Sequence, residues 1–113
     1  MLPQESDIGR IANTDSFMKE NFAKDISTVE AASRIGASRS YFCTVFKKWV
    51  GISFGDYLQQ IRIEHAKEKL EKTDIPVSEL AFLCGYNDIY YFSRVFHKVV
   101  GCSPLDYRKS KIV

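Results

Sequence analysis

The sequence predicts an all-α fold of about seven helices, arranged as two helix-turn-helix units joined by a long bridging helix. Apolar residues recur at helical spacing, no segment shows clear period-two alternation, and the sequence contains an internal repeat. Residues 40–57 read SYFCTVFKKWVGISFGDY, residues 90–107 read YYFSRVFHKVVGCSPLDY, and ten of these eighteen positions are identical. The similarity extends upstream through Gly36 and Gly85, and the copies differ by one residue in the turn or helix start that follows.

Capping and apolar signals place the helices of the first half, after an N-terminal tail over residues 1–7. Ser27, with Glu30 three residues later, forms a capping-box signature that opens the first helix-turn-helix, predicted over about 27–50. Ser38 can cap its second helix, and Gly51 suits a left-handed end. The inward residues expected on the first and third helices are Ile8, Ile11, Met18 and Phe22, and Phe42, Val45, Phe46 and Trp49.

The same pattern restarts after a long helix predicted over about 54–72, which Ser53 can cap. A second helix-turn-helix is expected over about 76–100, with Asn87 or Asp88 capping its second helix. A last helix follows over about 104–110, with a proline at its first position. The inward residues expected on the repeated helix are Phe92, Val95, Phe96 and Val99.

Two helix-turn-helix patterns in register favour DNA binding more strongly than a single pattern does. Any small helical bundle would meet the requirements of helix packing alone. The bridging segment of about 18 residues would be about 27 Å long, and recognition helices in successive major grooves lie about 34 Å apart. Since the copies are not identical, we expect an asymmetric pair of half-sites. The alternative is a helical protein–protein interaction module that kept this fold and lost DNA binding.

Charge and composition allow DNA as a partner without requiring it. The 113 residues carry a net charge of only +2, but residues 38–50 contain three basic side chains and no acidic one. Solvated helix faces would explain the same pattern. No apolar run approaches the length of a membrane span and no signal-peptide pattern is present, so we expect a cytoplasmic protein. Its three cysteines are predicted to be free thiols.

The segments AFLCGYNDIYYFSRVFHKVVGCSPLDYRK (81–109) and GISFGDYLQQIRIEHAKEKL (51–70) resemble the DNA-binding domain of the AraC/XylS family of bacterial transcription regulators. The resemblance covers residues 8–109 and implies sequence-specific binding of double-stranded DNA by a seven-helix domain. Phe54 stands where many members have proline, a form similar to the subgroup fused to two-component receiver domains. RNA polymerase and an N-terminal receiver or effector domain are the further partners expected of such a regulator.

The predicted DNA-binding residues lie on the outward faces of the two second helices, where the copies diverge. They are Arg39, Ser40, Cys43, Thr44, Lys47 and Lys48 in the first copy, and Ile89, Tyr90, Ser93, Arg94, His97 and Lys98 in the second. The fork of Arg39 suits guanine or phosphate, and the lysines suit phosphates. For the lysines the alternative is solvation, and for Arg94 it is a salt bridge within the domain.

Other candidate sites are weaker. His65, expected on a solvent face, and His97 have no cysteine or carboxylate at ligand spacing, and no zinc pattern or glycine-rich phosphate loop is present. We therefore predict no enzyme activity, metal or cofactor. Arg62 is expected to form a structural ion pair. The shared Tyr41 and Tyr91 are expected to serve packing or phosphate contact and not base choice.

Overall fold

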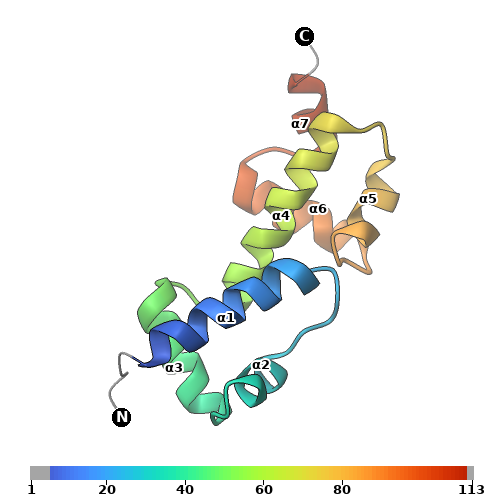
Figure 1. Cartoon of the computed structure of the whole chain (residues 1–113). Helices are drawn as coiled ribbons and strands as arrows, with labels where there is room; N and C mark the ends of the chain where they lie inside the picture. Colours follow the sequence, from blue (N-terminus) through green and yellow to red (C-terminus); the bar gives the residue numbers. More distant parts are fainter. Residues whose placement is uncertain (1–5, 112–113) are drawn as a thin grey trace. The chain divides into compact units, whose positions relative to one another are not determined.

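The computed structural model describes residues 6–111, and this part of the chain contains seven helices and no strand (Figure 1). The all-α prediction is therefore confirmed. In order, the helices are α1 (Ser6–Asn21), α2 (Thr28–Arg34), α3 (Arg39–Val50), α4 (Phe54–Lys72), α5 (Val77–Leu83), α6 (Ile89–Val100) and α7 (Pro104–Ser110). Helix α1 begins within the segment 1–7 that was expected to be a tail. None of the helices in residues 6–111 is long and apolar enough to cross a membrane.

The chain divides between Leu58 and Gln59 into two compact units. In the first unit, α1 and α2 both pack on α3. The side chains of Met18, Phe42 and Phe46 are fully buried there. Phe54, at the start of α4, meets the rings of Phe42 and Phe46 edge-on, with centroids 5.7 Å away in each case. This aromatic cluster fixes which face of α3 points inward.

In the second unit, α6 packs against α5 and α7. Its core also takes in residues of α4 beyond Leu58, and it includes Ile63, Ala66, Leu70, Leu80, Ala81, Cys84, Tyr86, Phe92, Val95, Phe96 and Tyr107. Phe92 and Phe96 are in contact at a centroid distance of 5.9 Å, as Phe42 and Phe46 are at 5.6 Å. The repeated sequence therefore builds the same kind of core twice.

The predicted caps Ser27, Ser38 and Ser53 each accept a hydrogen bond from a backbone N–H three residues later, at 3.1–3.2 Å. Ser103 caps α7 in the same way, at 3.1 Å. Of the two candidates for α6, Asp88 is the cap, and its Oδ1 accepts from the N–H groups of Tyr90 and Tyr91. Gly51 and Gly101 end α3 and α6 with φ of 96° and 99°, which only glycine adopts freely.

The two copies differ in length by one residue, and the extra residue lies in the turn of the second helix-turn-helix, between α5 and α6. The N–H of Ala37 donates to the carbonyl of Ala32, and the N–H of Tyr86 donates to Ala81 in the same way, each at 3.0 Å. Ser38 then caps α3 directly, whereas Asn87 stands between Tyr86 and the cap of α6. Asn87 is thus the extra residue.

Three apolar side chains predicted to point inward are exposed. Trp49 is 42% exposed and Val99 is 45% exposed, and Ile8 is 49% exposed. Trp49 and Val99 lie in the last turns of α3 and α6, where the packed part of each helix has ended. In the first turn of α1 the buried side chain is Asp7, so the buried stripe of this helix passes beside Ile8 and not through it.

Candidate nucleic-acid interface

The predicted DNA-binding face of α3 is turned to solvent because the opposite face of this helix packs in the core of the first unit. Phe42, Val45 and Phe46 are fully buried. The residues of the predicted face that are exposed are Arg39, Ser40, Thr44, Lys47 and Lys48. Cys43 is only half-buried and free of any disulfide, so it is less accessible than predicted.

Helix α6 repeats this arrangement in the second unit, where Phe92 and Phe96 are fully buried and Val95 is buried. The exposed residues of its predicted face are Tyr90, Arg94, His97 and Lys98. Ile89 and Ser93 are half-buried, which corrects the expectation that they are fully outward. Ser93 occupies the same helical position as Cys43, at the edge of the face where the buried stripe begins. Neither α3 nor α6 contains an acidic residue.

Two contacts on the α3 face were not predicted. The Nε of Arg39 donates a hydrogen bond to Thr28 Oγ1 at 2.9 Å, so the first residues of α3 and α2 are joined. The hydroxyl of Thr44 donates to the carbonyl of Ser40 at 3.0 Å. The hydroxyl proton of Thr44 is therefore engaged within its own helix.

The aromatic neighbours of two arginines in the second unit are also defined. Arg94, for which a salt bridge was the alternative, has its guanidinium 5.8 Å from the ring centroid of Tyr91. Arg62, expected to form an ion pair, has its guanidinium 5.4 Å from the ring of Tyr86. Burial raises the pKa of Tyr86 to about 12, and the charge of Arg62 acts in the opposite direction. Arg62 thus contacts the turn of the second helix-turn-helix.

His65, predicted on a solvent face, is half-buried.

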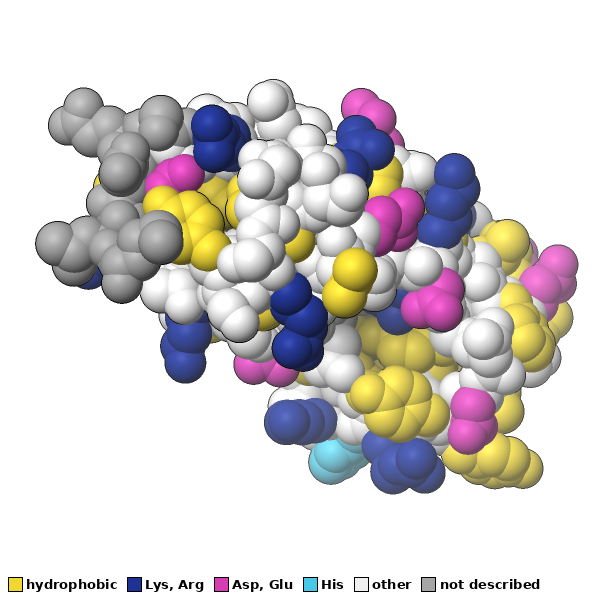
Figure 2. Space-filling model, turned by 90° about the horizontal axis from the view of Figure 1, so that it is seen from below, with side chains coloured by type: hydrophobic (Ala, Val, Ile, Leu, Met, Phe, Trp, Pro, Cys, Tyr) yellow, Lys and Arg dark blue, Asp and Glu magenta, His cyan; other side chains and the backbone are white. Residues whose placement is uncertain are grey.

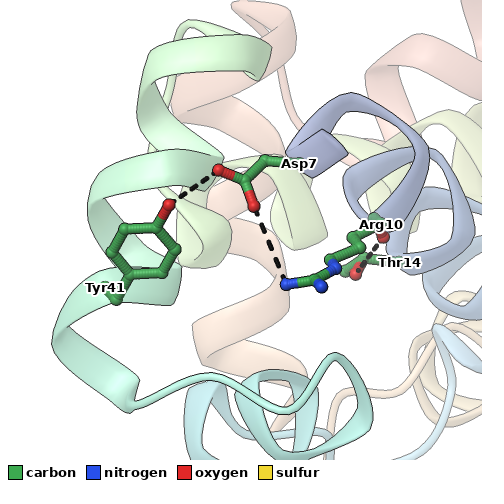
Figure 3. Close-up of polar contacts among 4 residues, drawn as sticks. All are labelled: Asp7, Arg10, Thr14 and Tyr41. Carbon is green, nitrogen blue, oxygen red and sulfur yellow. Dashed lines mark hydrogen bonds and ion pairs between the residues drawn. The ribbon is translucent and has the colours of Figure 1, made fainter. Parts of the chain in front are cut away.

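The shared tyrosines are anchored in different ways in the two units. The hydroxyl of Tyr41 donates to Oδ2 of Asp7 at 2.7 Å, and Arg10 lies 3.9 Å from the other carboxylate oxygen (Figure 3). This hydrogen bond is the main reason that the pKa of Tyr41 is raised. In the second unit, Tyr91 instead accepts a hydrogen bond from the side-chain amide of Gln59 at 3.0 Å.

The exposed surface combines basic and apolar side chains. Figure 2 shows lysine and arginine side chains at the surface, interspersed with aspartate and glutamate side chains, and hydrophobic side chains that also reach the surface. The large hydrophobic residues that are most exposed are Tyr90, at 75%, and Val29, at 62%. Within residues 6–111, no group of three histidine, cysteine, aspartate or glutamate side chains is placed to hold a metal ion.

Comparisons with known proteins agree on one family. A family model described as a helix-turn-helix domain matches residues 31–110. An uncharacterised helix-turn-helix transcriptional regulator of Escherichia coli, YijO, is 36% identical over 93 residues, which are 82% of this chain and 33% of that protein. The chain spans about a third of the length of the curated relatives it matches.

Two solved structures show the same fold. The C-terminal domain of AraT, a response regulator from Geobacillus stearothermophilus, is 31% identical, with a TM-score of 0.88 over 92% of this chain and 87% of that one. The DNA-binding domain of the global transcriptional factor AdpA, solved with a target DNA, is 26% identical, with a TM-score of 0.86 over 89% and 91%. With its two capped helix-turn-helix units, the chain belongs to the AraC/XylS family of transcription regulators and corresponds to their helix-turn-helix domain.

Proposed function

We propose that this chain binds double-stranded DNA in a sequence-specific manner and thereby regulates transcription, with α3 and α6 in successive major grooves of an asymmetric site. The observation that carries the proposal is the pair of outward faces on α3 and α6. Both belong to helices without acidic residues, both helices have a side-chain N-cap, a glycine C-cap and a buried pair of phenylalanines, and the two faces differ from each other in sequence. The complex of AdpA with its target DNA supports the same role for this fold.

Within this proposal the exposed residues divide by chemistry. Lys47, Lys48 and Lys98 neutralise phosphates, which position a protein on DNA without reading its sequence. Arg39, Ser40, Cys43 and Thr44 face the bases of one half-site. Since the Thr44 hydroxyl proton is used within the helix, its methyl group is the part offered to a thymine methyl. The corresponding residues that face the other half-site are Ile89, Tyr90, Ser93, Arg94 and His97.

The test begins with selection of bound sequences from a random duplex library, followed by affinity measurements over a range of salt concentrations. We expect one asymmetric consensus with two half-sites about one helical turn apart. We also expect affinity to fall steeply with salt, since each phosphate contact contributes about −0.9 to the slope of log affinity against log salt. Affinity that does not change with salt, or no duplex binding at low salt, would instead identify a protein–protein interaction module.

We further propose that the domain is the output end of a longer cytoplasmic regulator that contacts RNA polymerase. Phe54 in place of proline, and the similarity to the C-terminal domain of the response regulator AraT, favour an N-terminal receiver over another effector domain. The reading frame upstream of Met1 in the genome tests this directly. A receiver sequence there would support the proposal, and a different sensor domain would overturn its receiver part.

A further inference from the structure

The two recognition helices carry a tyrosine at the same position, the third residue of each helix, but the two tyrosines are held by different chemistry. Tyr41 of α3 donates to the carboxylate of Asp7 in the first turn of α1. Tyr91 of α6 accepts from the neutral amide of Gln59 on α4. A hydrogen bond to a carboxylate is roughly twice as strong as one between neutral groups. The start of the first recognition helix therefore has a charge-assisted hydrogen bond where the start of the second has a neutral one.

Asp7 is suited to a positioning role because it is buried. Only 2% of its surface is exposed, and a carboxylate in such a place requires hydrogen-bonding partners. Tyr41 supplies one partner, Arg10 lies 3.9 Å away, and the N-terminal end of α1 favours a negative charge. Figure 3 shows Asp7 lying between the Tyr41 ring and Arg10. Because it is buried, Asp7 does not itself contact a ligand in solution.

We propose that Asp7 and Tyr41 are positioning residues that couple the first turn of α1 to the DNA affinity of the first half-site. The second half-site is read through α6, which is held by Gln59, and does not depend on this pair. The chain enters α1 at Ser6, so a preceding domain that stabilises or frays this turn acts selectively on the first half-site. The inference rests on the proposed DNA-binding function and adds a route by which that function is regulated.

The experiment uses the selected duplex and two derivatives, one with the first half-site scrambled and one with the second scrambled. The variants are Tyr41→Phe, Asp7→Ala, Asp7→Asn and the double variant, with Tyr91→Phe as the matched control in the other unit. Circular dichroism and thermal unfolding show that each variant is folded. Hydrogen exchange compares the amides at the start of α3 with those at the start of α6.

We expect Tyr41→Phe and Asp7→Ala each to weaken binding to the full site by about tenfold. The loss should disappear on the probe whose first half-site is scrambled. Asp7→Asn keeps an acceptor oxygen and should recover part of the affinity. The double variant should be no weaker than either single variant, and exchange should accelerate in α3 but not in α6. Tyr91→Phe should affect only the second half-site.

Two results overturn the inference. Additive losses in the double variant would mean that Tyr41 contacts DNA directly, and unchanged binding by folded Asp7→Ala would mean that the pair does not position α3. Failure of the unmodified protein to bind any duplex would instead overturn the proposed function, so the two failures are distinguishable.

Discussion

The guanidinium of Arg39 and the hydroxyl of Thr28 are joined by a hydrogen bond of 2.9 Å from Nε to Oγ1. The bond connects the first residue of α3 to the first residue of α2. In a helix-turn-helix, the second helix lies in the major groove while the first crosses the backbone. Because Nε is engaged with Thr28, bidentate recognition of a guanine by Arg39 has to use its two terminal amino groups.

Replacing Arg39 with alanine should relax base preference within one half-site. A bidentate contact with guanine contributes about 1–3 kcal/mol of discrimination, so this amount should be lost at one base pair. Binding of a panel of single-base variants of the selected duplex, followed by fluorescence anisotropy, measures the effect.

Thr28→Val is the matched control for Arg39, because it removes the tether and keeps the guanidinium. It should reduce discrimination at the same base pair, but by less than Arg39→Ala does. If Arg39→Ala weakened all duplexes equally, Arg39 would be a phosphate contact and its assignment to a base would be wrong.

Lys47→Ala should weaken binding to all sequences to a similar extent, because a lysine at the exposed end of α3 is suited to a phosphate. Loss of one phosphate contact should reduce the magnitude of the salt slope by about 0.9. The control is Lys72→Ala, since Lys72 is paired with Glu68 at 3.2 Å on α4. An altered base preference without a change in salt slope would contradict the phosphate assignment.

The helices and their caps could be predicted because they depend on residues close together in the chain. Ser38 and Gly51 mark the ends of α3 through a hydrogen bond three residues away and a local φ of 96°. The outward faces of α3 and α6 could be predicted for the same reason, because the apolar stripe that is buried on one side of a helix determines which residues lie on the opposite side. Trp49 shows the limit of this reasoning, because burial depends on which element lies opposite.

The contacts that could not be predicted join residues far apart in the sequence. Asp7 and Tyr41 are separated by 34 positions, and Arg39 and Thr28 by 11. Side-chain patterns within one helix contain no information about which distant group completes such a pair. Although Tyr41 and Tyr91 are identical in sequence, one is bonded to a carboxylate and the other to an amide for this reason.

Two glycines in the first unit should respond in opposite ways to replacement by alanine. Gly51 has φ of 96°, where a Cβ is strained, so Gly51→Ala should lower the free energy of unfolding by about 1–2 kcal/mol. Gly55 lies within α4, and an added Cβ would meet no atom within 4 Å beyond its chain neighbours and the backbone of its own helix, so Gly55→Ala should raise it by about 0.4–1 kcal/mol. Urea unfolding measures both. A loss of stability in Gly55→Ala would show that the start of α4 is more crowded than the structure indicates.

Cys84 should make the protein less stable at alkaline pH. Burial raises the pKa of its thiol from 9.0 to about 11 in the folded state. Between these values the unfolded thiol ionises while the folded one stays protonated, so the unfolded state binds fewer protons and the free energy of unfolding falls as pH rises. The fall attributable to Cys84 is at most about 1.4 kcal/mol per pH unit.

Urea unfolding at several pH values from 8 to 11, on the wild-type protein and Cys84→Ala, isolates this contribution. The difference in free energy of unfolding between the wild type and Cys84→Ala should be constant up to about pH 9. It should then shrink towards pH 11, because alanine does not titrate. If the curves of the wild type and Cys84→Ala ran parallel over the whole range, the Cys84 thiol would not be desolvated as its position in the second core requires.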